Sequence, residues 1–149
     1  MSKDETIMQE CLRLAETSQA NGDYPFGCVI IDAEEHVLST GRNQEVTRND
    51  VSWHAEMEAL RTAQQKLQST DLSDCTLYTN GEPCVMCAAV IRRTGIHRVV
   101  VGAPSASSPA IKPDPLTDPE FSDTAPPVLK RGVLLNACLH IQGRESEIE

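Results

Sequence analysis

The pattern of apolar and polar positions predicts that helices and short strands alternate along most of this chain. Apolar residues recur at helical spacing from about Glu5 to Ala20, and Asn21-Gly22 then supplies a C-terminal stop. The β-prone runs Gly27 to Ile31 and Val37 to Thr40 are separated by a polar stretch, which predicts a hairpin. The chain therefore opens with one amphipathic helix followed by two adjacent strands.

The same alternation continues to the C-terminus. A second helix is expected to begin near Ser52, with Asp50 or Ser52 as its cap. The remaining expected elements are a strand at Cys75 to Thr79, a helix at Pro83 to Arg92, a strand at His97 to Val101, a strand at Val128 to Leu134 and a helix at Leu135 to Gln142. Strands alternating with helices predict a layered α/β sheet. The length of 149 residues fits a single domain over residues 1–149.

One segment breaks the alternation. Seven of the nine prolines fall between residues 102 and 127, so we expect no regular element to persist there. A long loop of this kind is either a lid over a site or a mobile linker. Both interpretations stay open.

Composition limits the classes of partner. Thirteen basic and twenty-two acidic residues give a formal charge of −9, which should repel phosphate backbones and makes nucleic acid an unlikely partner. The densest basic residues, Arg92, Arg93 and Arg98, are interpreted as a solvated helix end. No apolar run approaches the length of about eighteen residues that a membrane span needs, and no leader pattern opens the chain. We therefore expect a cytoplasmic protein without a membrane partner.

Six cysteines in a chain of this length predict reduced thiols rather than a disulfide framework. Two of them, Cys84 and Cys87, form a Cys-x-x-Cys pair, and the others are expected in the core as small hydrophobic residues. These four are Cys11, Cys28, Cys75 and Cys138.

The Cys-x-x-Cys pair and His54 each come at the expected start of a helix, where the dipole and unpaired amides favour anionic thiolates. Two thiolates and one imidazole would give a tetrahedral zinc ion three protein ligands and leave one position open for water. Zinc would then make hydroxide available near neutral pH. A carboxylate must also move protons, and either Glu56 or Glu58 satisfies this requirement on spacing alone.

Other classes of site explain the residues less well. A structural zinc would need a fourth protein ligand, and neither His97 nor His140 belongs to a second paired motif. A redox dithiol would leave His54-Ala55-Glu56 unexplained, and a metalloprotease would need a histidine where Glu58 stands. The sequence therefore favours a catalytic zinc.

The combination of His54-Ala55-Glu56 with Pro83-Cys84-x-x-Cys87 is the signature of zinc deaminases, and the sequence resembles the cytidine and nucleobase deaminase superfamily. Pro25-Phe26-Gly27 and Gly41-Arg42-Asn43 are also similar to stretches of guanine deaminases, fungal cytosine deaminases and tRNA-specific adenosine deaminases. The likeness runs over about residues 5 to 102.

The resemblance implies a three-layer α/β/α sandwich with a mixed five-stranded sheet, and usually a homodimer. It makes His54, Cys84 and Cys87 the zinc ligands, Glu56 rather than Glu58 the proton shuttle, and Asn43 a hydrogen-bonding contact to the substrate.

The expected substrate is a small, flat heterocycle. Phe26 and Trp53 lie next to the segments expected to line the pocket and could stack on a ring while Asn43 reads its polar edge. We expect zinc hydroxide to attack the amine-bearing carbon of a free nucleobase or related heterocycle and release ammonia. A guanine-like substrate is favoured, with a cytosine-like base or an amino-triazine next. Deamination of adenosine in tRNA is the alternative enzyme, and a catalytically silent zinc-binding interaction module is the alternative of another class.

Overall fold

A computed structural model describes residues 1–105 and 111–148 of the chain. The helices are α1 (Lys3–Ala20), α2 (Ala55–Leu67), α3 (Val85–Arg93) and α4 (Leu135–Ile141), with 3-10 turns η1 (Pro119–Phe121) and η2 (Glu145–Glu147). The strands are β1 (Gly27–Ile31), β2 (Val37–Arg42), β3 (Thr76–Gly81), β4 (Arg98–Ala103) and β5 (Val128–Arg131). No helix in these two described ranges is both long and apolar enough to cross a membrane.

The five strands form one mixed sheet in the order β2-β1-β3-β4-β5. Strand β1 pairs antiparallel with both β2 and β3, whereas β3, β4 and β5 run parallel to one another. Parallel neighbours need a crossover connection, and α3 provides it between β3 and β4. Every residue of β1 is buried, so both faces of the sheet must be covered.

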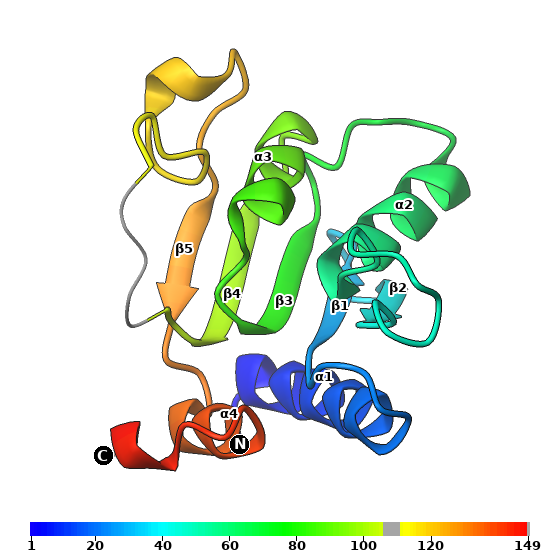
Figure 1. The fold of residues 1–149 in the computed structure, drawn as a ribbon. Helices are drawn as coiled ribbons and strands as arrows, with labels where there is room; N and C mark the ends of the chain where they lie inside the picture. The colour runs from blue at the N-terminus through cyan, green and yellow to red at the C-terminus, as the bar shows by residue number, and fades with distance from the viewer. Residues whose placement is uncertain (106–110, 149) are drawn as a thin grey trace.

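Helices cover the sheet on both sides and make a three-layer α/β/α sandwich (Figure 1). Helices α1 and α4 lie against one face, where Met8 and Cys138 belong to one apolar core. Helices α2 and α3 lie against the other face, where Leu60 and Ile91 belong to a second core. The predicted fold class is confirmed. The four cysteines expected in the core, Cys11, Cys28, Cys75 and Cys138, are all buried.

The second and third helices begin two or three residues later than the sequence pattern suggested. Helix α2 starts at Ala55 with His54 as its N-cap, because Asp50 Oδ1 instead accepts hydrogen bonds from the amide and hydroxyl of Ser52 in a preceding turn. Helix α3 starts at Val85 with Cys84 as its N-cap. Both motif residues therefore occupy the position immediately before the first helical turn.

Gly41 lets α2 approach the sheet closely. A Cβ atom at this position would lie 2.2 Å from the carbonyl oxygen of Ala55, the first residue of the helix. Any larger residue would push the first turn of α2 away from β2. The close approach thus fixes where His54 and Glu56 lie relative to the sheet.

Residues 111–127 are fastened to α3 and are not a free linker. The guanidinium of Arg92 is almost fully buried, and it donates hydrogen bonds to five backbone carbonyl groups in this segment. These carbonyls belong to Pro115, Asp118, Pro119, Ser122 and Thr124.

Two expectations for this part of the chain are therefore wrong. Arg92 does not belong to a solvated helix end, and the proline-rich segment contains the 3-10 turn η1. The buried guanidinium can hold an irregular segment in place, because its planar fork presents five N–H donors to the carbonyl groups of that segment. Residues 106–110 of the expected loop lie outside the described residues.

Candidate metal centre

The N-terminal ends of α2 and α3 bring His54, Cys84 and Cys87 together. Nδ1 of His54 lies 3.5 Å from Sγ of Cys84 and 3.4 Å from Sγ of Cys87. The three donor atoms all lie within 4.8 Å of one another. The structure thus assembles the three residues that the sequence motifs singled out, although thirty positions separate the histidine from the first cysteine.

The donor spacing fits a tetrahedral zinc ion. With Zn–S at roughly 2.3 Å and Zn–N at roughly 2.05 Å, tetrahedral geometry separates nitrogen and sulfur by roughly 3.6 Å. The observed separations of 3.4 and 3.5 Å are close to that value. In the described part of the chain, this cluster contains three donors, which leaves one position of a tetrahedron without a protein ligand.

The two cysteines differ in how readily they ionise. A hydrogen bond from the Cys87 thiol lowers the pKa of Cys84 to about 5, assisted by the amides of Cys87 and Met86 and by His54. That same bond, together with burial, raises the pKa of Cys87. A divalent cation would ionise the second thiol as well, because a coordinating thiol loses its proton outright.

Glu56 lies beside this cluster. Its side chain is 5% exposed and lines the same pocket as His54 and Cys84. Burial raises the pKa of Glu56 to about 7. A carboxyl group with a pKa near neutrality can both accept and donate a proton under ordinary conditions.

Glu58, the other carboxylate that spacing left open, has a different environment. Its two oxygens accept hydrogen bonds from the amide of Arg42, from Nε2 of Gln44 and from Nε1 of Trp53. Arg42 is the last residue of β2, and Gln44 and Trp53 lie in the loop between β2 and α2. Glu58 therefore holds that loop against the helix, and it is not among the described residues that line the pocket.

The pocket next to the three donors is small, with a volume of about 120 Å³. The described residues that line it are Phe26, Asn43, Glu45, His54, Ala55, Glu56, Glu82 and Cys84. Gly81 allows the Phe26 ring its place, because a Cβ atom there would lie 2.7 Å from Cε1 of the ring. The walls thus combine one aromatic ring with three carboxyl groups, and neither lysine nor arginine is among the lining residues that the structure describes.

Asn43 is in the pocket, as the sequence predicted, but its amide is already paired. Nδ2 of Asn43 donates to Oε2 of Glu45 at 2.6 Å, and Oδ1 accepts from the backbone amide of Glu45 at 3.0 Å. One amide hydrogen and one carbonyl lone pair remain for a substrate. Its role as a substrate contact stays a prediction.

Trp53 lies outside the set of described residues that line the pocket. Its ring is covered by Arg48 at 4.3 Å and by Arg61 at 5.7 Å, measured from each guanidinium carbon to the ring centroid. Its indole nitrogen donates to Glu58 at 2.7 Å. Stacking of Trp53 on a substrate stays a prediction that would require the ring to leave these contacts.

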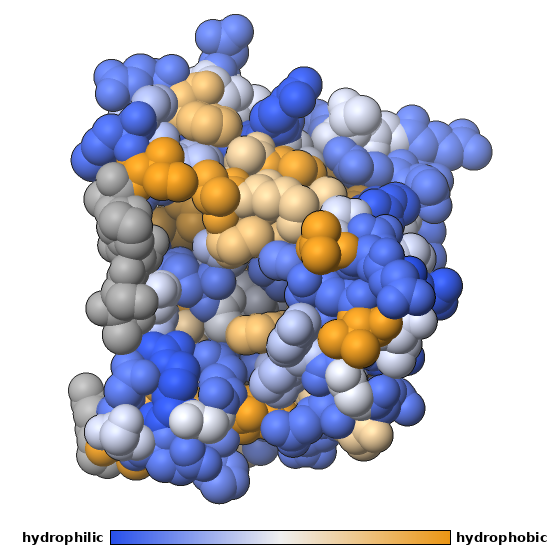
Figure 2. All heavy atoms as spheres, viewed as in Figure 1, coloured by the Kyte–Doolittle hydropathy of each residue, from blue (hydrophilic) through white to orange (hydrophobic). Residues whose placement is uncertain are grey.

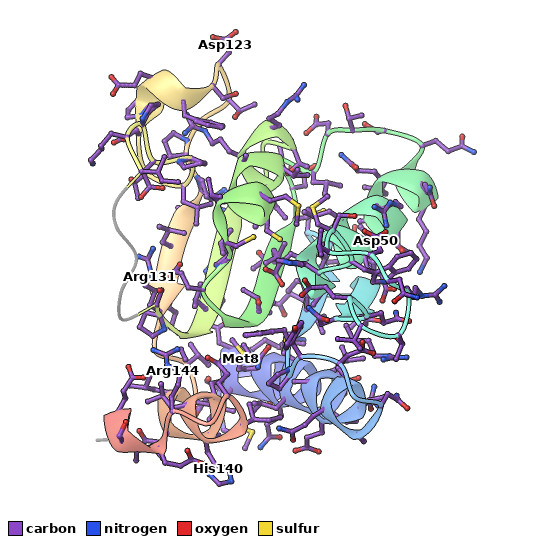
Figure 3. All side chains as sticks on the ribbon, in the orientation of Figure 1. Met8, Asp50, Asp123, Arg131, His140 and Arg144 are labelled. Atoms are coloured by element: carbon purple, nitrogen blue, oxygen red, sulfur yellow. The ribbon has the colours of Figure 1, made fainter. Side chains whose placement is uncertain are left out.

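Sequence reasoning missed two acidic residues of the pocket. Glu45 follows Asn43 by two positions, and only that proximity could have suggested it. Glu82 precedes the Pro83-Cys84 motif, and its Oε1 accepts a hydrogen bond from Nε of Arg131 at 2.8 Å. Arg131 is the last residue of β5 and lies 49 positions after Glu82 in the sequence; Figure 3 labels it beside that strand.

A second depression lies beside this pocket, between α3 and the segment fastened to it. It has a volume of about 190 Å³ and is lined in part by Val85, Ile111 and Leu116. Figure 2 shows apolar side chains gathered over this part of the molecule, next to a hollow in the same face.

Residues 1–103 match the family model described as the cytidine and deoxycytidylate deaminase zinc-binding region. The chain is 37% identical over 108 residues to a tRNA-specific adenosine deaminase from Haemophilus influenzae, a match that covers 72% of this chain and 62% of that protein. It is 36% identical over 100 residues to a probable cytosine deaminase from Schizosaccharomyces pombe, covering 67% and 60%. The chain thus spans about three fifths of the length of these two relatives.

A solved structure of a guanine deaminase from Nitrosomonas europaea superposes on this fold with a TM-score of 0.78. It is 26% identical, and the superposition covers 98% of this chain and 86% of that chain.

Proposed function

Because the chain belongs to the family of the cytidine and deoxycytidylate deaminase zinc-binding region, we propose that it is a zinc-dependent hydrolytic deaminase of a free nucleobase or related amino-heterocycle. One observation carries the proposal. A buried carboxyl group, Glu56, shares a small pocket with His54 and Cys84, two of the three donors whose spacing fits zinc. A purely structural zinc site would have no need for a buried carboxyl group with a pKa near 7 beside it.

In this proposal each residue has one task. His54, Cys84 and Cys87 would hold the zinc ion, which when bound would supply an activated water at neutral pH. Glu56 takes a proton from that water and delivers it to a ring nitrogen, and then carries the second proton to the departing amine. The balance is one water consumed, one C–N bond broken, one C–O bond formed and one ammonia released.

The charge of the pocket supports a small neutral substrate. Glu45, Glu56 and Glu82 line it, and a phosphate brought among these carboxylates would be repelled. Carboxylate oxygens accept hydrogen bonds from N–H groups, so a ring with several N–H donors on its edge suits these walls. We therefore favour guanine-like amino-purines, followed by cytosine and amino-triazines, with Phe26 stacking on the ring.

The test is ammonia release by the zinc-loaded protein with guanine, 2,6-diaminopurine, cytosine and an amino-triazine, each beside its nucleoside or nucleotide. We expect activity on at least one free base and little on the phosphorylated form. Glu56→Gln serves as the matched inactive enzyme, because it preserves the size of the side chain. Inactivity of the wild-type protein on the whole panel would contradict the proposal.

A tRNA adenosine deaminase is the second candidate, and the identity to the Haemophilus influenzae enzyme favours it. Two observations weigh against tRNA as the substrate, because phosphate contacts need accessible basic side chains. The formal charge is −9, and two of the three clustered arginines are already engaged: Arg92 is buried and Arg98 is paired with Asp4. Inosine formation in tRNA, with no ammonia released from free bases, would reverse this ranking.

A catalytically silent zinc-binding module is the candidate of a different class. It predicts equal, background rates for the wild type and Glu56→Gln on every substrate. The expected homodimer and cytoplasmic location also stay predictions, and light scattering on the purified protein tests the first of them.

A further inference from the structure

The imidazole of His54 connects the three-donor cluster to a carboxylate that no motif identifies. Its Nδ1 faces the two sulfur atoms at 3.5 and 3.4 Å. Its Nε2, on the opposite side of the ring, lies 3.4 Å from Oε2 of Glu45. The ring thus presents one nitrogen to the ion site and the other to an acceptor.

Glu45 is held in place by its own loop. Asn43 Nδ2 donates to the same Oε2 atom at 2.6 Å, and the backbone amide of Glu45 donates to Asn43 Oδ1 at 3.0 Å. The next two amides, those of Val46 and Thr47, donate to Oδ1 of Asp23, whose side chain is fully buried. The carboxylate therefore has a fixed position that does not depend on a ligand.

We infer that Glu45 is a positioning residue, whose carboxylate accepts the Nε2–H of His54 and so keeps Nδ1 unprotonated and aimed at the metal. A histidine ligand that donates its second N–H to a carboxylate is fixed in tautomer and orientation and binds metal more tightly. The 3.4 Å contact is longer than an ideal N–H···O bond. We expect it to shorten when Nδ1 binds a cation, because coordination makes the Nε2–H more acidic.

This inference rests on the proposed role of His54 as a zinc ligand, and it adds a residue that the proposed function does not need. Oε1 of Glu45 has no hydrogen-bond partner among the described residues, so it could accept a hydrogen bond from a substrate. The competing explanation is therefore that Glu45 binds the substrate and does not position His54. The two explanations differ in a measurement made without substrate. Only a positioning residue changes the affinity for zinc itself.

The experiment measures zinc affinity by competition with a chromophoric chelator for the wild type, Glu45→Gln, Glu45→Ala and His54→Ala. We expect Glu45→Ala to bind zinc roughly 10- to 100-fold more weakly. Glu45→Gln should lose less than Glu45→Ala, because its amide oxygen can still accept the Nε2–H. Glu16→Gln, an exposed position on α1, is the matched control and should equal the wild type.

A second readout separates positioning from general loosening of the loop. In the cobalt-substituted protein, the visible absorption bands report the ligand geometry, and they should shift in Glu45→Ala and recover in part in Glu45→Gln. Wild-type zinc affinity together with an unchanged cobalt spectrum in Glu45→Ala would overturn the inference. If His54→Ala also bound zinc as the wild type does, the proposed function would fall with it; if only Glu45→Ala did, the proposed function would stand.

Discussion

Nδ1 of His54 lies 3.4 Å from Sγ of Cys87, although 33 positions separate the two residues in the chain. The contact exists because α2 and α3 both begin at the same end of the sheet. His54 is the N-cap of α2, and Cys87 belongs to the first turn of α3. A site built from two helix starts depends on each of them.

Loss of one donor should therefore release the metal. We expect Cys87→Ala to lose zinc on dialysis against a mild chelator, because two remaining donors cannot complete the protein's share of a tetrahedral site. Cys75→Ala removes another buried thiol outside the cluster and should keep zinc at the wild-type ratio. Elemental analysis of the dialysed proteins measures both, and a zinc-replete Cys87→Ala would contradict the assignment.

Glu56 and Glu58 should separate chemistry from structure. Glu56→Gln cannot accept a proton, so we expect kcat to fall by roughly 10² to 10⁴ while zinc content stays unchanged. Glu58→Gln weakens the contacts to the amide of Arg42 and to the Gln44 and Trp53 side chains. Its main effect should be a lower melting temperature, with a smaller fall in kcat than in Glu56→Gln. If Glu58→Gln instead lost kcat and Glu56→Gln lost only stability, Glu58 would be the proton shuttle and Glu56 the structural residue.

The three donors could be predicted from the sequence because a metal site requires particular residue types at short spacings. The Cys-x-x-Cys pair sets two ligands within one helical turn, and His54 with Glu56 supplies the complementary chemistry. Most of the strands could be predicted for a similar reason, since a short run of β-prone residues bounded by polar or turn residues is a local pattern. The predicted run Gly27 to Ile31 coincides with β1.

The contacts that escaped prediction are those made between distant segments. Arg92 looked like one of several basic residues at a helix end, and its acceptors lie 23 to 32 positions further along the chain. Trp53 stands next to a donor in the sequence, yet its ring packs against Arg48 and Arg61. Adjacent residues in an extended segment point in different directions, so sequence proximity alone could not place the indole.

Asp4 should make stability depend on pH on the acidic side. Its carboxylate accepts hydrogen bonds from Arg98, Lys130 and Tyr78, at 2.7 Å from the closest atom of each. The bond from Arg98, followed by those from Lys130 and Tyr78, holds the pKa of Asp4 well below its usual range. Burial, together with the hydrogen bond that the Tyr78 hydroxyl donates to Asp4, raises the pKa of Tyr78 to about 12.

A carboxyl group with a lowered folded-state pKa stabilises the fold above its unfolded pKa, about 3.9 for aspartate. That contribution is lost as the pH falls below this value. We expect Asp4→Asn to lower the free energy of unfolding on the order of 2 kcal/mol at pH 7, and the difference from the wild type to shrink below roughly pH 4. Urea titrations across pH measure it. Asp123→Asn, on an exposed side chain at the far end of the molecule (Figure 3), should show no such trend.

Arg92 offers the sharpest test of how residues 111–127 are held. Its side chain is 1% exposed, so the guanidinium makes its hydrogen bonds to these carbonyls in a site largely closed to solvent. Arg92→Lys keeps the positive charge but supplies three donors in place of five, without the planar fork. Buried carbonyl groups left without a donor cost roughly 1 to 3 kcal/mol each.

We therefore expect Arg92→Lys to lower the free energy of unfolding by about 3 kcal/mol and to speed protease cleavage between residues 111 and 127. Arg93→Lys is the matched control, since the adjacent side chain is exposed. Zinc affinity should change little in Arg92→Lys, because the guanidinium lies beyond the first turn of α3 that carries Cys87. Equal protease sensitivity of the two variants would mean that the segment is held by its apolar contacts, such as buried Leu116, and not by the arginine.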